Sequence, residues 1–136
     1  MEKTLRIPIT TKFVLVLITG LVWTLAGCAN VRPNSQFTLK VSSTTAGSAF
    51  DGQCTSQVAD LRSGVVAKGI KVQGIVPAPE KPQEFAMTGF YIYCVVANQA
   101  SNSLITVELW QNGNMVARST SSAPDEPVLI EFGEKP

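Results

Sequence analysis

The residues of this chain with the greatest chemical potential are three cysteines: Cys28, Cys54 and Cys94. The chain contains no histidine, so it can build neither a Ser-His-Asp triad nor a Cys-His pair to activate a nucleophile. Structural zinc sites use four Cys or His ligands, which three thiols do not supply. We therefore predict no catalytic residue, no metal and no cofactor, and expect the thiols to be modified or cross-linked.

The segment before Cys28 has the pattern of a signal peptide. Residues 1–12 carry three basic residues and one acid, and the next 15 residues, 13–27, form an uncharged and mainly apolar run. A helix of that length rises about 22 Å, short of the roughly 30 Å hydrocarbon core of a bilayer. Residues 1–27 are therefore predicted to be a cleaved leader. The alternative is an uncleaved anchor in which Cys28 occurs by chance.

The leader ends in Leu25-Ala26-Gly27-Cys28, which resembles the lipobox of bacterial lipoproteins in all four positions. The resemblance implies cleavage after Gly27, a diacylglyceryl group on the sulfur of Cys28, and often a further acyl chain such as palmitate on the new amine. Two or three chains anchor a protein stably, whereas one is marginal. Ala29 replaces the Asp of an inner-membrane retention signal. We therefore expect the outer membrane if the envelope has two membranes, and otherwise the outer leaflet of the cell membrane.

The part of the chain after the leader is long enough for one domain. It has 109 of the 136 residues, with eight basic and nine acidic side chains, and domains of this size are common. Such a balance lacks the basic excess that nucleic-acid binding requires. The polar residues 28–36 are predicted to be a lipidated tether. Residues 37–133 are then the folded domain, and residues 134–136 a tail.

Cys54 and Cys94 are the two thiols that remain if Cys28 is lipidated. Disulfides persist outside the cytoplasm, and an even number of cysteines there predicts a bridge. Closing a loop of about 40 residues stabilises a domain by roughly 4 kcal/mol through loop-closure entropy. Two free buried thiols are the alternative, because spacing alone does not show that the sulfur atoms meet.

Short strands are the dominant pattern in the domain. Phe37, Leu39 and Val41 alternate with polar residues, which indicates a strand with one buried face. Residues 90–97 are apolar on both faces, which is typical of a central strand. An Asn-Gly pair in residues 111–114 favours a type I′ hairpin turn. Further strands are expected at 54–61, 65–76, 85–87, 104–110, 115–120 and 128–132, with turns at 43–51 and 119–127.

The fold class follows from these strands. No segment after Cys28 shows the 3.6-residue apolar stripe of a helix. Short strands separated by turns predict an all-β fold, a small antiparallel β-sandwich that is immunoglobulin-like in a loose sense. Within residues 65–76, Gly69 and Gly74 are expected at bulges or bends.

Residues 90–132 resemble part of a known family. A central strand, the segment ITVELWQNGNMVARSTSS and a closing strand are similar to the C-terminal half of the MmpS-type β-sandwich proteins, which accompany mycobacterial MmpL-type lipid exporters. The resemblance implies support of an exporter in the envelope. This chain lacks that family's cysteines in and after the hairpin, and has a lipobox in place of a membrane-spanning anchor.

Aromatic strand residues are the remaining candidates for a functional surface. Tyr91, Tyr93 and Trp110 could line an exposed strand face that grips a partner or a glycan, although such residues more often pack against cross-strand neighbours. The main hypothesis is a non-catalytic envelope module, held to the membrane through Cys28, that binds another envelope protein. The alternatives are an exporter subunit or, with less support, a cell-wall enzyme with two carboxylates about 5 to 10 Å apart.

Overall fold

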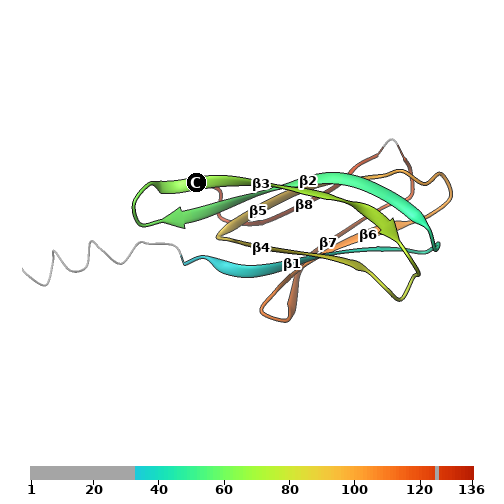
Figure 1. Ribbon diagram of the computed structural model, residues 1–136, viewed down its shortest axis with the longest axis horizontal. Helices are drawn as coiled ribbons and strands as arrows, with labels where there is room; N and C mark the ends of the chain where they lie inside the picture. Colours follow the sequence, from blue (N-terminus) through green and yellow to red (C-terminus); the bar gives the residue numbers. More distant parts are fainter. Residues whose placement is uncertain (1–32, 125) are drawn as a thin grey trace, which may run out of the picture. The chain divides into compact units, whose positions relative to one another are not determined.

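The computed structural model describes residues 33–124 and 126–136 (Figure 1). The predicted leader, the lipobox and Cys28 lie outside the described residues, as does Asp125. The described residues contain no helix and form eight strands, which are β1 (Ser35–Ser43), β2 (Ser48–Asp60), β3 (Gly64–Val76), β4 (Gln83–Gly89), β5 (Tyr91–Asn98), β6 (Ile105–Gln111), β7 (Asn114–Ser121) and β8 (Val128–Gly133).

These strands make two sheets of four strands each. The first sheet has the order β4-β1-β6-β7 and the second the order β3-β2-β5-β8, and every neighbouring pair is antiparallel. The two sheets lie face to face, as Figure 1 shows. The prediction of a small antiparallel β-sandwich is therefore confirmed, and it shares with immunoglobulin domains the packing of two antiparallel sheets.

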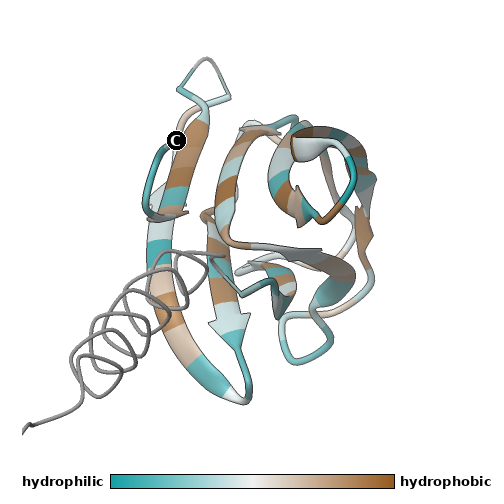
Figure 2. Ribbon diagram, turned by 90° about the vertical axis from the view of Figure 1, so that its left-hand side faces the viewer, coloured by the Kyte–Doolittle hydropathy of each residue, from teal (hydrophilic) through white to brown (hydrophobic). Residues whose placement is uncertain are grey.

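Alternation of apolar and polar residues decides which face of each strand is buried. Successive side chains of a strand point to opposite faces of its sheet, and Figure 2 shows hydrophobic and hydrophilic bands alternating along the strands. The inward positions of both sheets meet in one core. Its buried members are Phe37, Leu39, Val41, Phe50, Cys54, Val72, Val76, Met87, Ile92, Cys94, Val96, Ile105, Val107, Leu109, Val128 and Ile130.

The central strand expected at residues 90–97 is β5. It lies between β2 and β8 in the second sheet, which explains why both of its faces are largely apolar. Ile92, Cys94 and Val96 are fully buried on the inner face. The expected hairpin is also present, because β6 and β7 pair around Asn112 and Gly113 with φ angles of 50° and 81°, as a type I′ turn requires.

Strand β2 differs from its prediction. It begins at Ser48 and not at residue 54, so the expected turn at residues 43–51 is wrong over its last four residues. The prediction failed because the inward positions of β2 include the small residues Ser48, Gly52 and Ser56, which give a weak apolar pattern. Pairing with both β3 and β5 makes this segment a strand, since tertiary context overrides weak propensity.

The pairing of β2 with β3 excludes one of the two alternatives predicted for Gly69 and Gly74, that of bulges. Its register runs without a shift from Ser48 opposite Val76 to Asp60 opposite Gly64, so Gly69 and Gly74 mark no bulge. A Cβ atom at Gly74 would lie 3.4 Å from the Phe50 ring. That distance is an ordinary van der Waals contact, so a small side chain at this position would touch the ring without displacing it.

A single residue, Phe90, connects β4 in the first sheet to β5 in the second. The buried Ser56 hydroxyl donates a hydrogen bond to the carbonyl oxygen of Thr88, and the N–H of Phe90 donates to the carbonyl oxygen of Gln57 at 2.9 Å. A Cβ atom at Gly89 would lie 2.5 Å from the Ser56 oxygen and 2.6 Å from the Gln57 oxygen. Only glycine therefore fits at this crossing.

The predicted disulfide between Cys54 and Cys94 is present. The two residues are direct register partners on β2 and β5, with 4.0 Å between their Cα atoms, and both are fully buried. The bridge lies within the second sheet, whereas the bridge of antibody domains joins the two sheets. It therefore fixes the register of two strands and not the distance between the layers.

Removal of this bridge tests its contribution to stability. We expect the double variant Cys54→Ala, Cys94→Ala to lose about 4 kcal/mol of unfolding free energy, because a bridge between residues 40 apart restricts the unfolded chain. Urea unfolding followed by fluorescence measures the difference. Reductant should destabilise the natural protein and leave the variant unchanged. A variant as stable as the natural protein would contradict the assignment.

Candidate functional site

The candidate site is a shallow, open concavity of about 710 Å³ on the outer face of the second sheet. Strands β2, β3 and β5 supply its lining, which is Asp51, Gly52, Gln53, Thr55, Gly69, Lys71, Tyr93, Val95 and Ala97. The concavity is therefore built from strand residues, which a sheet positions more rigidly than a loop does.

Strand register arranges the lining in rows across the sheet. Gly69, Thr55 and Tyr93 are successive partners in one row, since Thr55 faces Gly69 on β3 and Tyr93 on β5. In the next row, Gln53 is the partner of both Lys71 and Val95. Gly69 has no side chain, and Nε2 of Gln53 lies 3.3 Å from the place that its Cβ atom would take. The side chain of Gln53 therefore reaches across the β3 side of the row that contains Tyr93.

The chemistry of the concavity is mixed. It offers the carboxylate of Asp51, the ammonium group of Lys71, the amide of Gln53 and the hydroxyl of Thr55 beside the ring of Tyr93, which is 37% exposed. Such a surface provides both hydrogen-bond donors and hydrogen-bond acceptors next to an aromatic ring. This combination suits a polypeptide or glycan segment lying across the sheet, and Asp51 is the only carboxylate in the lining.

Tyr91, which lies on β5 with Tyr93 and was predicted to share its partner surface, is held by a contact within the domain. Its side chain is 6% exposed, and its hydroxyl donates a hydrogen bond to Oε1 of Glu131 at 2.5 Å. This hydrogen bond and, to a smaller extent, burial of the side chain raise the pKa of Tyr91 to about 12. Both favour the neutral phenol beside a carboxylate. Tyr91 thus links β5 to β8 and is not available to a partner.

Trp110 belongs to a different surface, the outer face of the first sheet. Its Nε1 donates a hydrogen bond to Oε2 of Glu108 at 3.0 Å, and Nζ of Lys40 lies 4.7 Å from the centroid of its ring. Lys40 pairs with Glu84 at 3.2 Å, and Arg118 pairs with Glu108 at 3.8 Å. The network joins all four strands of this sheet, and its cations neutralise both carboxylates.

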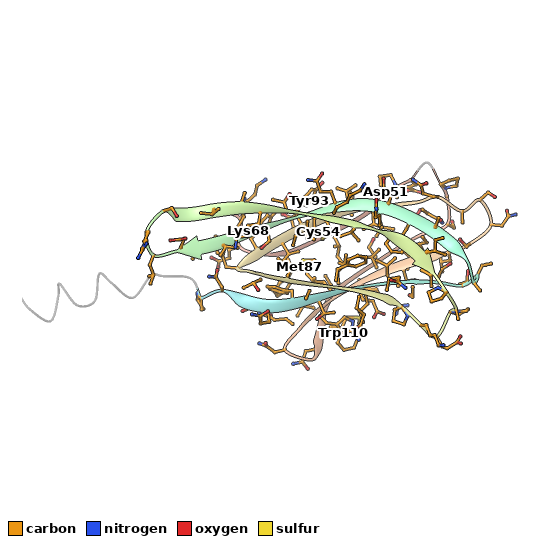
Figure 3. All side chains as sticks on the ribbon, in the orientation of Figure 1. Asp51, Cys54, Lys68, Met87, Tyr93 and Trp110 are labelled. Atoms are coloured by element: carbon orange, nitrogen blue, oxygen red, sulfur yellow. A yellow bond between two sulfur atoms is a disulfide. The ribbon has the colours of Figure 1, made fainter. Side chains whose placement is uncertain are left out.

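The three aromatic residues proposed as one surface are therefore divided. Figure 3 shows Tyr93 and Asp51 on one side of the sandwich and Trp110 on the other. The concavity keeps Tyr93 and adds Asp51, Gln53 and Lys71, which the sequence analysis did not select. A period-two run of polar residues at positions 51, 53, 55 and 57 was the signal that could have found them.

Metal-binding clusters and membrane-spanning helices are absent from the described part of the chain. It holds no group of three or more His, Cys, Asp or Glu side chains placed to bind a metal ion. Residues 33–124 and 126–136 also include no helix of the length and hydropathy needed to cross a bilayer. No protein-family model matches the chain, and no curated protein matches it in sequence.

The contact between Tyr91 and Glu131 predicts a specific alkaline titration. The chain has two tyrosines, so a Tyr93→Phe variant reports on Tyr91 alone. We expect tyrosinate absorbance with a midpoint near pH 12, which Glu131→Gln should move toward the ordinary value of 10.0.

The same contact predicts how stability depends on pH. Because the pKa of Tyr91 is about 12 in the folded protein against an ordinary value of 10.0, its contribution is complete below pH 10 and is lost as the pH rises to 12. A midpoint near 10 for Tyr91 in the folded Tyr93→Phe variant would contradict the hydrogen bond.

Proposed function

We propose that this protein is a lipid-anchored, non-catalytic module of the bacterial envelope that binds another envelope protein through the concavity on its second sheet. The observation that carries the binding role is the concavity itself. It lies on β3 and on β2 and β5, the two strands that the Cys54–Cys94 bridge holds together. A rigid surface loses little conformational entropy when a partner binds.

Anchoring is supported by the residues that precede the domain. The short apolar run and the Leu25-Ala26-Gly27-Cys28 sequence fit cleavage before Cys28 and acylation of its sulfur. The disulfide of the domain is consistent with folding outside the cytoplasm, where such bridges persist. We accordingly propose the outer membrane as the location in an envelope with two membranes, and the outer leaflet of the cell membrane in an envelope with one.

A binding role fits the concavity better than a catalytic one does. Hydrolysis of a glycan by the usual mechanism needs two carboxyl groups on either side of the bond, and Asp51 is the only carboxylate in the lining. The chain has no histidine to activate Thr55. The exposed ring of Tyr93 instead fits the core of a protein interface, where tyrosine is enriched, and the charged groups of Asp51 and Lys71 fit its polar rim.

Mass spectrometry tests the anchoring. The natural protein, purified from bacterial membranes, should have the mass of residues 28–136 with acyl chains added and two hydrogen atoms lost to the disulfide. A Cys28→Ser variant should keep its leader and carry no acyl chain. The control is the double variant Cys54→Ser, Cys94→Ser, which should still be acylated. Cleavage and membrane retention of Cys28→Ser would contradict the proposal.

Photocrosslinking in intact cells tests the binding face. We expect benzoylphenylalanine in place of Tyr93 to give one discrete adduct, because this residue lines the concavity and is exposed. The matched control is the same substitution at Thr120, an exposed residue of β7 in the first sheet. Equal adducts at both positions, or none at Tyr93, would argue against the proposed face. Identification of the adduct would also distinguish an exporter from another envelope protein.

A further inference from the structure

We propose that the tip of the β2–β3 hairpin, residues 60–65, contacts the lipid surface to which the protein is anchored. This inference rests on the proposed function, because it requires acyl chains on Cys28. It adds a second membrane contact, made by the folded domain itself, and so a defined orientation of the sandwich on the bilayer.

The hairpin tip exposes apolar side chains. Leu61 is 92% exposed and Val65 is 51% exposed. The pairing of β2 with β5 ends at Gln57 opposite Tyr91, whereas its pairing with β3 continues to Asp60 opposite Gly64. The last part of the hairpin is therefore a two-stranded ribbon that extends past β5, as Figure 1 shows.

The turn holds Leu61 in place. Oδ1 of Asp60 accepts hydrogen bonds from the N–H groups of Arg62 at 2.7 Å and Ser63 at 3.3 Å, and these donors keep the pKa of Asp60 below its ordinary value. Gly64, the first residue of β3, has a φ of 78°, a left-handed conformation that glycine adopts at no steric cost. The exposed leucine is thus presented by an ordered turn, which reduces the entropy lost on contact.

The chain enters the domain beside the same turn. Nδ2 of Asn34 donates to the carbonyl oxygen of Ala59 at 2.9 Å, and the N–H of Ala59 donates to Oδ1 of Asn34 at 2.8 Å. Ala59 is the register partner of Val65 and lies two residues before Leu61. The side chain of Asn34 therefore pairs with the edge of β2 where the pairing with β5 has ended.

Chain length then limits the distance from the hairpin tip to the membrane. Cys28 precedes Asn34 by six residues, and six residues span at most about 21 Å when fully extended. Acyl chains on Cys28 would keep Asn34 within that distance of the lipid headgroups. Leu61 lies two residues beyond Ala59, the partner of Asn34, which adds only about 7 Å to the limit for the hairpin tip. Proximity of this kind raises the effective concentration of a weak second contact.

The chemistry of the tip favours lipid as the occupant. Leu61 and Val65 can enter the boundary between headgroups and acyl chains. The two exposed basic side chains, Arg62 and Lys68, outnumber the exposed carboxylate of Asp60, so the balance of charge at this end of the hairpin favours anionic headgroups. A stable protein partner usually covers about 800 Å² on each side, far more than two apolar side chains provide. A bilayer needs no matching surface, so a small apolar tip with basic neighbours is sufficient.

Lipid quenching tests the contact in the full, acylated protein. The chain has two tryptophans, of which Trp23 is in the predicted leader, so a Trp110→Phe background leaves none after cleavage. In vesicles of acyl-brominated phosphatidylcholine with phosphatidylglycerol, a Val65→Trp variant should lose fluorescence relative to the same vesicles without bromine. Adding Leu61→Glu to that variant should restore the fluorescence.

The matched control is Ile75→Trp in the same background. Ile75 lies on the same strand, is 58% exposed, and stands about 33 Å along the strand from Val65. It should not be quenched. Three results for the acylated protein would contradict the lipid contact. The first is no quenching of Val65→Trp, and the second is equal quenching of Val65→Trp and Ile75→Trp. The third is a blue shift of the Val65→Trp emission without quenching, as burial by a second protein would cause. A protein without acyl chains would overturn the anchoring and this inference with it.

Discussion

The pairing of β2 with β5 is the constraint on which most of this structure depends. Strand β2 has few large apolar residues, yet it lies in the middle of the second sheet between β3 and β5. The Cys54–Cys94 bridge joins direct register partners, and a slip of one residue would turn every side chain of a strand to the other face. The bridge thereby fixes which residues of β2 face the core and which line the concavity.

The two outer faces of the sandwich serve different purposes. On the first sheet, Lys40 lies between Glu84 and the ring of Trp110, and Arg118 pairs with Glu108. These exposed pairs contribute little stability singly, but they occupy the polar groups of that face with one another. The second sheet instead presents a concavity of about 710 Å³ whose charged, amide and aromatic groups lie open. That difference between the faces is the reason for assigning the partner surface to the second sheet.

The sandwich also has two different ends. The contact of Asn34 with Ala59 places the entry of the chain beside the β2–β3 turn. At the other end, Leu104 forms hydrogen bonds with Thr44 in the connection between β1 and β2. In the proposed arrangement, with the anchor six residues before Asn34, the first end would face the lipid. The concavity then lies along the side of the domain, where a neighbour in the same membrane can reach it.

The sequence by itself determined the strands with strong alternation, the Asn112-Gly113 turn and the central place of β5, because each depends on a local pattern of residues. It also predicted the pairing of Cys54 with Cys94, because these are the two cysteines that remain after Cys28. It did not locate the start of β2 or show that Tyr93 and Trp110 lie on opposite sheets. Only tertiary structure decides these points, since the stability of a strand with small and polar residues comes from its neighbours. The candidate site depends on the same long-range register, which brings residues of β5 next to the β2–β3 hairpin. No local period encodes that arrangement.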